Sequence, residues 1–319
     1  MIEVEKLSKY YDTTAAIEDL TFSIQRGEVI GFLGLNGAGK STTLRILGCV
    51  LLPTSGSVRI DGKDLSAQPE EIRKQIGFLP DTPPLYDEMQ VGDYLAFVAR
   101  LRGVPEARIP AMVIDAEEKT ALREAHQVVI GSLSHGFRQR IGVAQAIVHQ
   151  PALLILDEPT SGLDPVQIVQ MRELIRNLKG QHTILLSSHI LSEISQTCDR
   201  LLVVHEGRLV AQGSEQDLAG GAASLGRIEI EVVGPSEHGI GDKALTALRS
   251  LSDIKTSRIV HEQSGMARLA VEAPSTLRPQ IVRALVAANI DLQRIDYGAP
   301  ELESIFLRLT QAGPSGVQA

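Results

Sequence analysis

A glycine-rich turn between two regular segments constrains the fold of this chain more than any other feature of the sequence. The turn, residues 34–41, follows the short apolar run 29–33 and precedes a helical stretch, residues 42–50. An apolar run without polar alternation is typical of a strand that is covered on both faces of its sheet. A buried strand, a glycine-rich turn and a helix in this order predict an α/β domain whose turn binds phosphate groups.

The residue types in the turn explain this chemistry. Glycines allow the backbone to pass close to phosphate oxygens, and the start of the following helix adds about half a positive charge. Lys40 would reach the β- and γ-phosphates of a nucleotide, and the Ser41 hydroxyl would ligate Mg²⁺. A purely structural turn is the alternative, but the flanking strand and helix favour phosphate binding. The predicted nucleotide-binding residues here are Asn36, Gly37, Ala38, Gly39, Lys40, Ser41 and Thr42.

The length of the chain and a change in its pattern predict two domains. A chain of 319 residues is long for one average domain. Up to residue 218, apolar runs such as 152–156 and 183–187 alternate with helical stretches, which indicates parallel strands joined by helices. A stretch rich in glycine and small residues follows, as in a linker. We predict a first domain at 1–218, a linker at 219–226 and a second domain at 227–319.

The second domain has a different pattern. Ile228, Ile230 and Val232 alternate with charged residues, as in a half-exposed strand. Similar alternation occurs around Leu269, and two helical stretches separate the strands, so we predict a small α+β domain of the ferredoxin-like kind. Apolar residues spaced three or four apart predict a final amphipathic helix over residues 300–310.

The composition excludes several classes of function. The net charge of -8 argues against nucleic-acid binding, which depends on clustered Lys and Arg. The chain has no run of 18 apolar residues, and charges occupy its first ten residues, so we expect a cytosolic chain that does not itself cross a membrane. Cys49 and Cys198 lack CxxC spacing and are expected to be buried thiols without a metal or disulfide.

A pair of adjacent carboxylates narrows the class of phosphate-binding protein. The glycine-rich turn alone occurs in kinases, GTPases and recombinases. Asp157 and Glu158 directly follow an apolar run, where one carboxylate can bind Mg²⁺ through water and the next can act on an attacking water. Two acids that merely end a strand are the alternative. The pair resembles that of the ATP-binding cassette (ABC) family, which implies that Asp157 is the Mg²⁺ aspartate and Glu158 the catalytic base.

The resemblance becomes specific at residues 133–140, Leu-Ser-His-Gly-Phe-Arg-Gln-Arg, which are similar to the signature sequence of this family. Ser134 and Gly136 would open a helix whose N-terminus faces a γ-phosphate, in the family that of the partner subunit's ATP. His135 stands where the commonest form has Gly, and Phe137 stands where it has Gln. Both departures resemble variants of exporter-type cassettes. The same residues also predict a helix with Ser134 at its N-cap and one buried face.

Three further positions match the family in their order along the chain. Residues 161–164, Ser-Gly-Leu-Asp, resemble the loop that crosses between subunits. His189 resembles the switch histidine that contacts the γ-phosphate, although a lone histidine at a strand end is more often structural. Tyr11 stands near the place of the ring that stacks on adenine, with Tyr10 as a competitor for this role.

The clearest departure from the family is Asp81, which stands where the family usually has Gln or Glu contacting Mg²⁺ and the water. The aspartate keeps the oxygen but is one methylene shorter. We therefore expect either a water-bridged contact or a looser link between the nucleotide and the partner-facing segment, residues 82–90.

The resemblance covers residues 1–218, and residues 300–310 look like the tail of bacterial exporter cassettes of the gliding-motility and antibiotic-export types. It implies a P-loop NTPase fold with a helical subdomain, ATP and Mg²⁺ as ligands, and ATP hydrolysis that drives a separate integral membrane permease. Two cassettes would sandwich two ATP head to tail, and a C₂ homodimer suffices because both halves of the site are present. A heterodimer remains open. The expected location is peripheral, on the cytoplasmic face of the cell membrane.

The alternatives come from other classes of cassette protein. A soluble cassette ATPase acting on ribosomes would carry two cassettes in one chain, whereas this chain has one set of motifs. A DNA-repair type would insert a long coiled coil between residues 40 and 134, where sustained heptads are absent from the sequence. A degenerate scaffold would have lost Lys40 or Glu158, and both are present. For residues 227–310, a dimer-stabilising or regulatory role is open.

Overall fold

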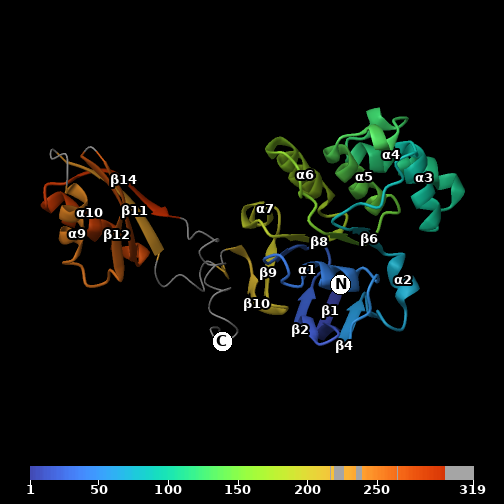
Figure 1. Cartoon of the computed structure of the whole chain (residues 1–319), viewed down its shortest axis with the longest axis horizontal. Helices are drawn as coiled ribbons and strands as arrows, with labels where there is room; N and C mark the ends of the chain where they lie inside the picture. The colour runs from blue at the N-terminus through green and yellow to red at the C-terminus, as the bar shows by residue number, and fades with distance from the viewer. Residues whose placement is uncertain (216, 219–225, 235–238, 264, 299–319) are drawn as a thin grey trace. The chain divides into compact units, whose positions relative to one another are not determined.

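The chain forms two compact units, Met1–Ser214 and Glu215–Ala319, shown in Figure 1. The structure is a computed structural model and describes residues 1–215, 217–218, 226–234, 239–263 and 265–298. The division at Ser214 falls close to the predicted boundary at residue 218. Most of the predicted linker and the predicted helix at 300–310 lie outside the described residues.

An antiparallel sheet forms the N-terminal part of the first unit. Its strand order is β2-β1-β4-β5. Both long strands, β1 and β2, carry register shifts where they pair, and Lys6 adopts a φ of 46° within β1. The strands are β1 (Ile2–Tyr11), β2 (Thr14–Ile24), β4 (Ser55–Ile60) and β5 (Lys63–Asp64).

A second sheet, mainly parallel, carries the glycine-rich turn. Its order is β10-β9-β3-β8-β7-β6, and only the edge strand β10 pairs antiparallel. The three predicted apolar strands are neighbours in this sheet and are buried throughout, which confirms that prediction. The strands are β3 (Val29–Leu33), β6 (Ile76–Leu79), β7 (Leu153–Leu156), β8 (Thr183–Ser188), β9 (Arg200–His205) and β10 (Arg208–Gly213).

Some helices of the first unit pack near this sheet, and others form a separate helical layer. Helices α3, α4 and α5 pack against one another and group together in Figure 1, as expected for the helical subdomain of a cassette. None of the described helices is both long and apolar enough to span a bilayer. The helices are α1 (Lys40–Leu47), α2 (Pro69–Arg73), α3 (Val91–Leu101), α4 (Ile109–Lys119), α5 (His135–Ile147), α6 (Pro165–Leu178) and α7 (Leu191–Ser195).

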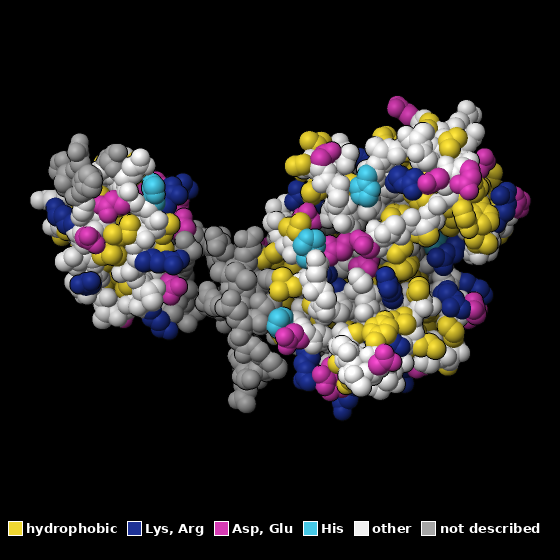
Figure 2. All heavy atoms as spheres, viewed as in Figure 1, with side chains coloured by type: hydrophobic (Ala, Val, Ile, Leu, Met, Phe, Trp, Pro, Cys, Tyr) yellow, Lys and Arg dark blue, Asp and Glu magenta, His cyan; other side chains and the backbone are white. Residues whose placement is uncertain are grey.

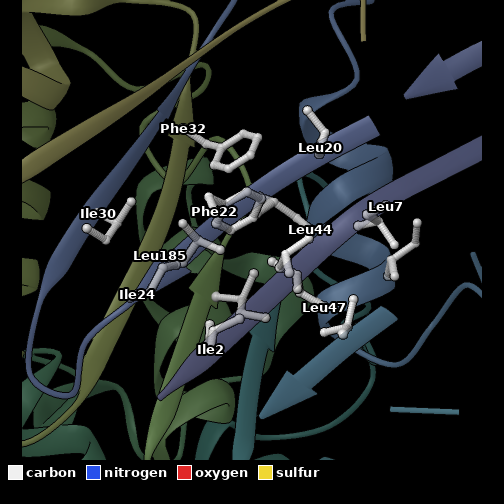
Figure 3. Close-up of a cluster of buried hydrophobic side chains, with 14 of the residues drawn as sticks. Ile2, Leu7, Leu20, Phe22, Ile24, Ile30, Phe32, Leu44, Leu47 and Leu185 are labelled. Carbon is white, nitrogen blue, oxygen red and sulfur yellow. The ribbon is translucent and has the colours of Figure 1, made fainter. Parts of the chain in front are cut away.

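The core of the first unit lies between the two sheets and α1. Figure 3 shows Phe22 of β2 beside Phe32 of β3, and their ring centroids lie 5.6 Å apart in an edge-to-face arrangement. Leu44 and Leu47 of α1 point into the same cluster. Full burial of each such side chain contributes about 1.5–3 kcal/mol. This packing fixes the end of β3 relative to α1 and so holds the turn between them.

The second unit has the predicted α+β arrangement. Its sheet has the antiparallel order β12-β13-β11-β14, and the sequence of elements is strand, helix, strand, strand, helix, strand, as in ferredoxin-like domains. Ile228, Ile230 and Val232 are fully buried, which confirms the alternation predicted for this strand. The elements are β11 (Gly226–Val233), α9 (Ile240–Leu248), β12 (Thr256–Gln263), β13 (Met266–Ala273), α10 (Arg278–Ala287) and β14 (Asp291–Gly298).

Candidate nucleotide-binding site

The glycine-rich turn is held by contacts that only glycine permits. Gly39 has a φ of 100°, and a Cβ at this position would lie 2.6 Å from the Ala16 carbonyl oxygen. The backbone can therefore adopt this bend only without a side chain. The Ala38 carbonyl accepts a hydrogen bond from the Gly207 N–H at 3.1 Å, which ties the turn to the loop between β9 and β10.

Lys40 directs its charge into the turn. Its Nζ donates to the Gly34 carbonyl at 2.8 Å and to the Leu35 carbonyl at 3.3 Å, and lies 3.4 Å from Oε1 of Glu158. The side chain is only 6% exposed. A buried ammonium group is tolerated where polar groups surround it, so these oxygens hold the charge where phosphate oxygens would enter.

A pocket of about 330 Å³ opens beside the turn and collects predicted residues from four separate segments of the chain. Ala38 is buried under the turn rather than in the pocket wall. A larger cavity of about 660 Å³ lies in the helical subdomain, and none of the predicted site residues lines it. The lining of the smaller pocket is Ala16, Asn36, Gly37, Gly39, Lys40, Ser41, Thr42, Asp81, Glu158, Ser161 and His189.

Asp157 offers a free oxygen next to this pocket. Its Oδ1 accepts hydrogen bonds from Ser41 Oγ at 3.1 Å and from Ser187 Oγ at 2.7 Å. Its Oδ2 is buried and has no hydrogen-bond partner among the described residues. Burial raises the pKa of Asp157, against the lowering effect of the two hydroxyls. A buried oxygen without a partner, beside a serine hydroxyl, fits a hard cation such as Mg²⁺.

Glu158 has an unusual backbone conformation. Its φ is 50°, in the left-handed region, which costs a residue other than glycine about 1 kcal/mol. Two hydrogen bonds hold it there: its N–H donates to Ser187 Oγ at 2.9 Å, and its carbonyl accepts from the Ser161 N–H at 3.0 Å. Strain that the surroundings enforce in this way is typical of functional sites.

Ser187 is a site residue that the sequence interpretation missed. Its single hydroxyl accepts from the backbone of Glu158 and donates to the carboxylate of Asp157. The available signal was a polar residue at the end of an otherwise apolar strand. Ala16 was missed as well, and its position in β2 gives no comparable signal.

His189 lies against the carboxylate of Glu158. Its Nδ1 is 3.0 Å from Oε2 of Glu158, while Oε1 of the same carboxylate faces Lys40. The structure thus brings together Lys40, Glu158 and His189 from three distant parts of the chain. Asp81 also lines the pocket. Tyr11 does not line it; the residue is 48% exposed, and Lys9 Nζ lies 5.5 Å from the centroid of its ring, so its adenine contact stays a prediction.

The signature segment opens helix α5, and its residues are not among those that line this pocket. Ser134 occupies the N-cap position as predicted, although its hydroxyl accepts no capping hydrogen bond. A Cβ on Gly136 would lie 2.7 Å from the Gln167 side chain, so the helix start packs closely on α6. Ser134 and Gly136 are not part of the pocket wall around Lys40. The buried face of α5 includes Ile141, Ala144 and Ile147, as predicted.

Comparisons with known proteins place these features in a family. The family model described as ABC transporter matches residues 17–161. The bacitracin transport ATP-binding protein BcrA of Bacillus licheniformis is 32% identical over 318 residues, 99% of each chain. The Nod factor export ATP-binding protein I of Paraburkholderia xenovorans is 33% identical and covers 97% of this chain and 96% of its own.

Solved structures agree with this assignment for the first unit. A structure of the ATP binding subunit of an ABC transporter has a TM-score of 0.64 and 34% identity, over 70% of this chain and 93% of its own. The structure of cbiO1 from Clostridium perfringens, part of the ABC transporter complex cbiONQ, has a TM-score of 0.64 and 30% identity, over 70% and 92% of the two chains.

Proposed function

The chain belongs to the ATP-binding subunits of ABC transporters, and from that premise we propose how its own residues bind ATP, hydrolyse it and act on a permease. As a member of this family it is an ATPase whose hydrolysis is coupled to transport through a separate membrane subunit. The observation that carries the residue roles is the convergence of Lys40, Glu158 and His189 on one pocket.

In the proposed reaction, the backbone N–H groups of the turn and Lys40 bind the β- and γ-phosphates of ATP. Glu158 accepts a proton from the attacking water while the water oxygen bonds to the γ-phosphorus. The bond to the bridging oxygen breaks, and ADP keeps the electron pair. His189 orients Glu158 through Nδ1, which leaves Nε2 as the nitrogen available to the γ-phosphate.

Mg²⁺ is proposed to be held by Ser41 and by Asp157, with Asp81 as a further oxygen ligand of this site. When bound, the ion neutralises charge on the β- and γ-phosphate oxygens. The unpartnered Oδ2 of Asp157 supports this proposal, since a buried carboxylate oxygen without a donor is costly.

We propose that a second copy of the chain completes each site. The start of α5, with Ser134 and Gly136, does not line the pocket around Lys40 of its own chain. The Ser134 side chain is exposed, and its hydroxyl is not used for capping. In a C₂ head-to-tail homodimer this helix start would meet the γ-phosphate of the opposite ATP. ATP would then favour the closed dimer, and hydrolysis would reopen it.

The proposed permease contact lies next to Asp81. Tyr86, in the segment 82–90, is 51% exposed, and its ring lies edge to face with the rings of Tyr94 and Phe97. Tyrosine is enriched at protein interfaces, because its ring supplies apolar contact area and its hydroxyl a polar group. The Tyr94 hydroxyl contacts the Pro84 carbonyl at 3.0 Å, which steadies this segment on α3. A permease at this surface would hold the subunit at the cytoplasmic face of the cell membrane.

We propose export as the direction of transport. The supporting observation is that relatives matched over nearly their whole length are a bacitracin transport, a linearmycin resistance and a Nod factor export ATP-binding protein. A ribosomal or DNA-repair role has less support. On the face in Figure 2, basic side chains are interspersed with acidic ones, and the net charge is -8.

The test is to identify the partner of the ATP-bound state. The Glu158→Gln variant, tagged and expressed in host cells, is purified from solubilised membranes with ATP, beside tagged wild type without ATP. Mass spectrometry is expected to find one stoichiometric, multi-spanning membrane protein enriched with the variant. Ribosomal or DNA-repair proteins in its place, with purified wild type hydrolysing ATP, would contradict the transport role and leave the ATPase standing.

Replacing Asp81 with Glu is expected to preserve or raise permease-stimulated ATPase. The extra methylene restores the reach of the longer side chain toward the ion and the water. The measurement is ATPase activity of the subunit with its permease in lipid vesicles, compared with the subunit alone. Asp253→Glu, at an exposed position of the second unit, is the control. A loss of stimulation of fivefold or more at Asp81 would show that the short side chain is required.

A further inference from the structure

The first residue of α5 reaches the loop that follows the proposed catalytic base. Nε2 of His135 lies 3.0 Å from the carbonyl oxygen of Ser161. A carbonyl oxygen only accepts hydrogen bonds, so Nε2 carries the proton and donates it. The bond joins two segments that are 26 residues apart in the chain.

The imidazole ring also rests on the backbone of this loop. Gly162 has a φ of 72°, and a Cβ there would lie 3.0 Å from Nε2 of His135 and 3.4 Å from Cδ2. The glycine therefore serves two purposes: it permits the left-handed turn and leaves room for the ring. His135 itself is exposed, so this contact does not form part of the hydrophobic core.

Ser161 connects this contact to the nucleotide pocket. Ser161 lines the pocket, and its N–H donates to the carbonyl of Glu158 at 3.0 Å. A continuous path of two hydrogen bonds thus runs from His135 through the two polar ends of Ser161 to the backbone of Glu158. The other anchors of the loop act elsewhere: Thr160 bonds the Glu193 side chain at 2.5 Å, and Asp164 caps α6.

Glu158 needs such support because its backbone is in the left-handed region. Ser187 of β8 accepts a hydrogen bond from the Glu158 N–H, and the Ser161 N–H donates one to the Glu158 carbonyl. Without a fixed Ser161, only the bond from Ser187 would remain on the backbone of the base. The carboxylate position between Lys40 and His189 depends on this backbone.

We infer that His135 is a positioning residue that holds Ser161 and, through it, the catalytic carboxylate of Glu158; the inference rests on the ATPase mechanism proposed above. The same helix end carries Ser134 and Gly136, which in the proposed homodimer contact the ATP bound by the second chain. A displacement of α5 on dimer closure is therefore passed to the base of the same chain through this side chain.

Three variants separate the two contacts of the ring. His135→Phe keeps a ring over Gly162 without the donor, His135→Gln keeps a donor without the ring, and His135→Ala removes both. The exposed side chain and its place in the first turn of α5 make all three compatible with the fold. His261→Phe, at an exposed histidine of the second unit, is the matched control.

Steady-state ATPase assays are expected to show a three- to tenfold lower kcat for His135→Phe and His135→Ala, with KM for ATP within twofold of wild type. His135→Gln is expected to keep at least half of the wild-type kcat, and His261→Phe all of it. Hydrogen exchange of a peptide spanning residues 158–164 is expected to be faster in the Phe and Ala variants and unchanged in the Gln variant. A merely structural role would not produce rescue by Gln together with an unchanged KM.

Two outcomes would overturn the inference in distinguishable ways. If wild type is active and the Phe and Ala variants match it in kcat and in exchange of residues 158–164, His135 does not position the base, while the proposed function stands. If wild type has no measurable ATPase either alone or with its permease, the proposed function fails and this inference fails with it.

Discussion

Replacement of Glu158 by Gln is expected to lower the ATPase kcat by about 10²- to 10⁴-fold, the usual contribution of a general base. The amide has the shape of the carboxylate but does not accept a proton from water at neutral pH. Backbone support from Ser187 and Ser161 is independent of the side chain, so the fold of the loop is expected to persist. ATP binding is expected to be kept or strengthened, because the carboxylate no longer repels the γ-phosphate.

The measurement combines single-turnover hydrolysis of ATP with equilibrium binding of a fluorescent ATP analogue. Glu206→Gln is a closely matched control, because Glu206 also has a left-handed φ, 46°, and its side chain is 83% exposed outside the pocket. The control is expected to retain wild-type kcat. A Glu158→Gln variant within tenfold of wild type would show that another group accepts the proton.

The nucleotide end of the fold was predictable because its signals are local. The strands β3 and β7 carry no polar side chain, and β8 is apolar between Thr183 and Ser187, a composition typical of strands buried on both faces. The turn before α1 is recognisable in the sequence by its glycines, which its positive φ angles and its close contacts with neighbouring backbone require. The alternation of apolar and charged residues also predicted the strand around Ile230 in the second unit.

The antiparallel sheet at the N-terminus was not assigned from the sequence, for a physical reason. Strand β1 has a burial pattern in which strict alternation breaks at Lys6, and its pairing with β2 shifts register between Val4 and Leu7. A bulged strand loses the period of two on which strand prediction depends. The position of Lys6 in the left-handed region marks the same irregularity.

The parts of the site that were missed depend on contacts between distant segments. Ser187 is recognisable only once β8 lies beside β7 and its hydroxyl reaches both acids. The left-handed backbone of Glu158 has no signature in its side chain. In the same way, His135 was noted as a departure at one position, whereas its bond to Ser161 exists only in the folded chain.

Replacement of Lys40 by Met is expected to weaken ATP binding by about 100-fold or more. Methionine keeps the length and apolar stem of lysine but removes the ammonium group. A charge-assisted hydrogen bond contributes about 1.5–3 kcal/mol, so loss of one or two such bonds to phosphate corresponds to roughly 10- to 10⁴-fold in affinity. Equilibrium binding of the fluorescent analogue with Mg²⁺ is the measurement, and Lys243→Met, exposed on α9, is the control.

The contacts of Lys40 in this structure sharpen that test. Its ammonium group also donates to the carbonyls of Gly34 and Leu35, so its loss removes two hydrogen bonds from the turn. Among the described residues, the Glu158 carboxylate then keeps His189 as its ion-pair partner. A fall in thermal stability would therefore accompany the loss of affinity if the turn itself loosened. Lys40→Arg separates the loss of charge from the loosening of the turn. The guanidinium keeps the charge, but it is larger, and a site where the side chain is 6% exposed has little room for it. Wild-type affinity in the Met variant would contradict the assignment of Lys40 to the phosphates, because no rearrangement of the apolar stem replaces the lost charge.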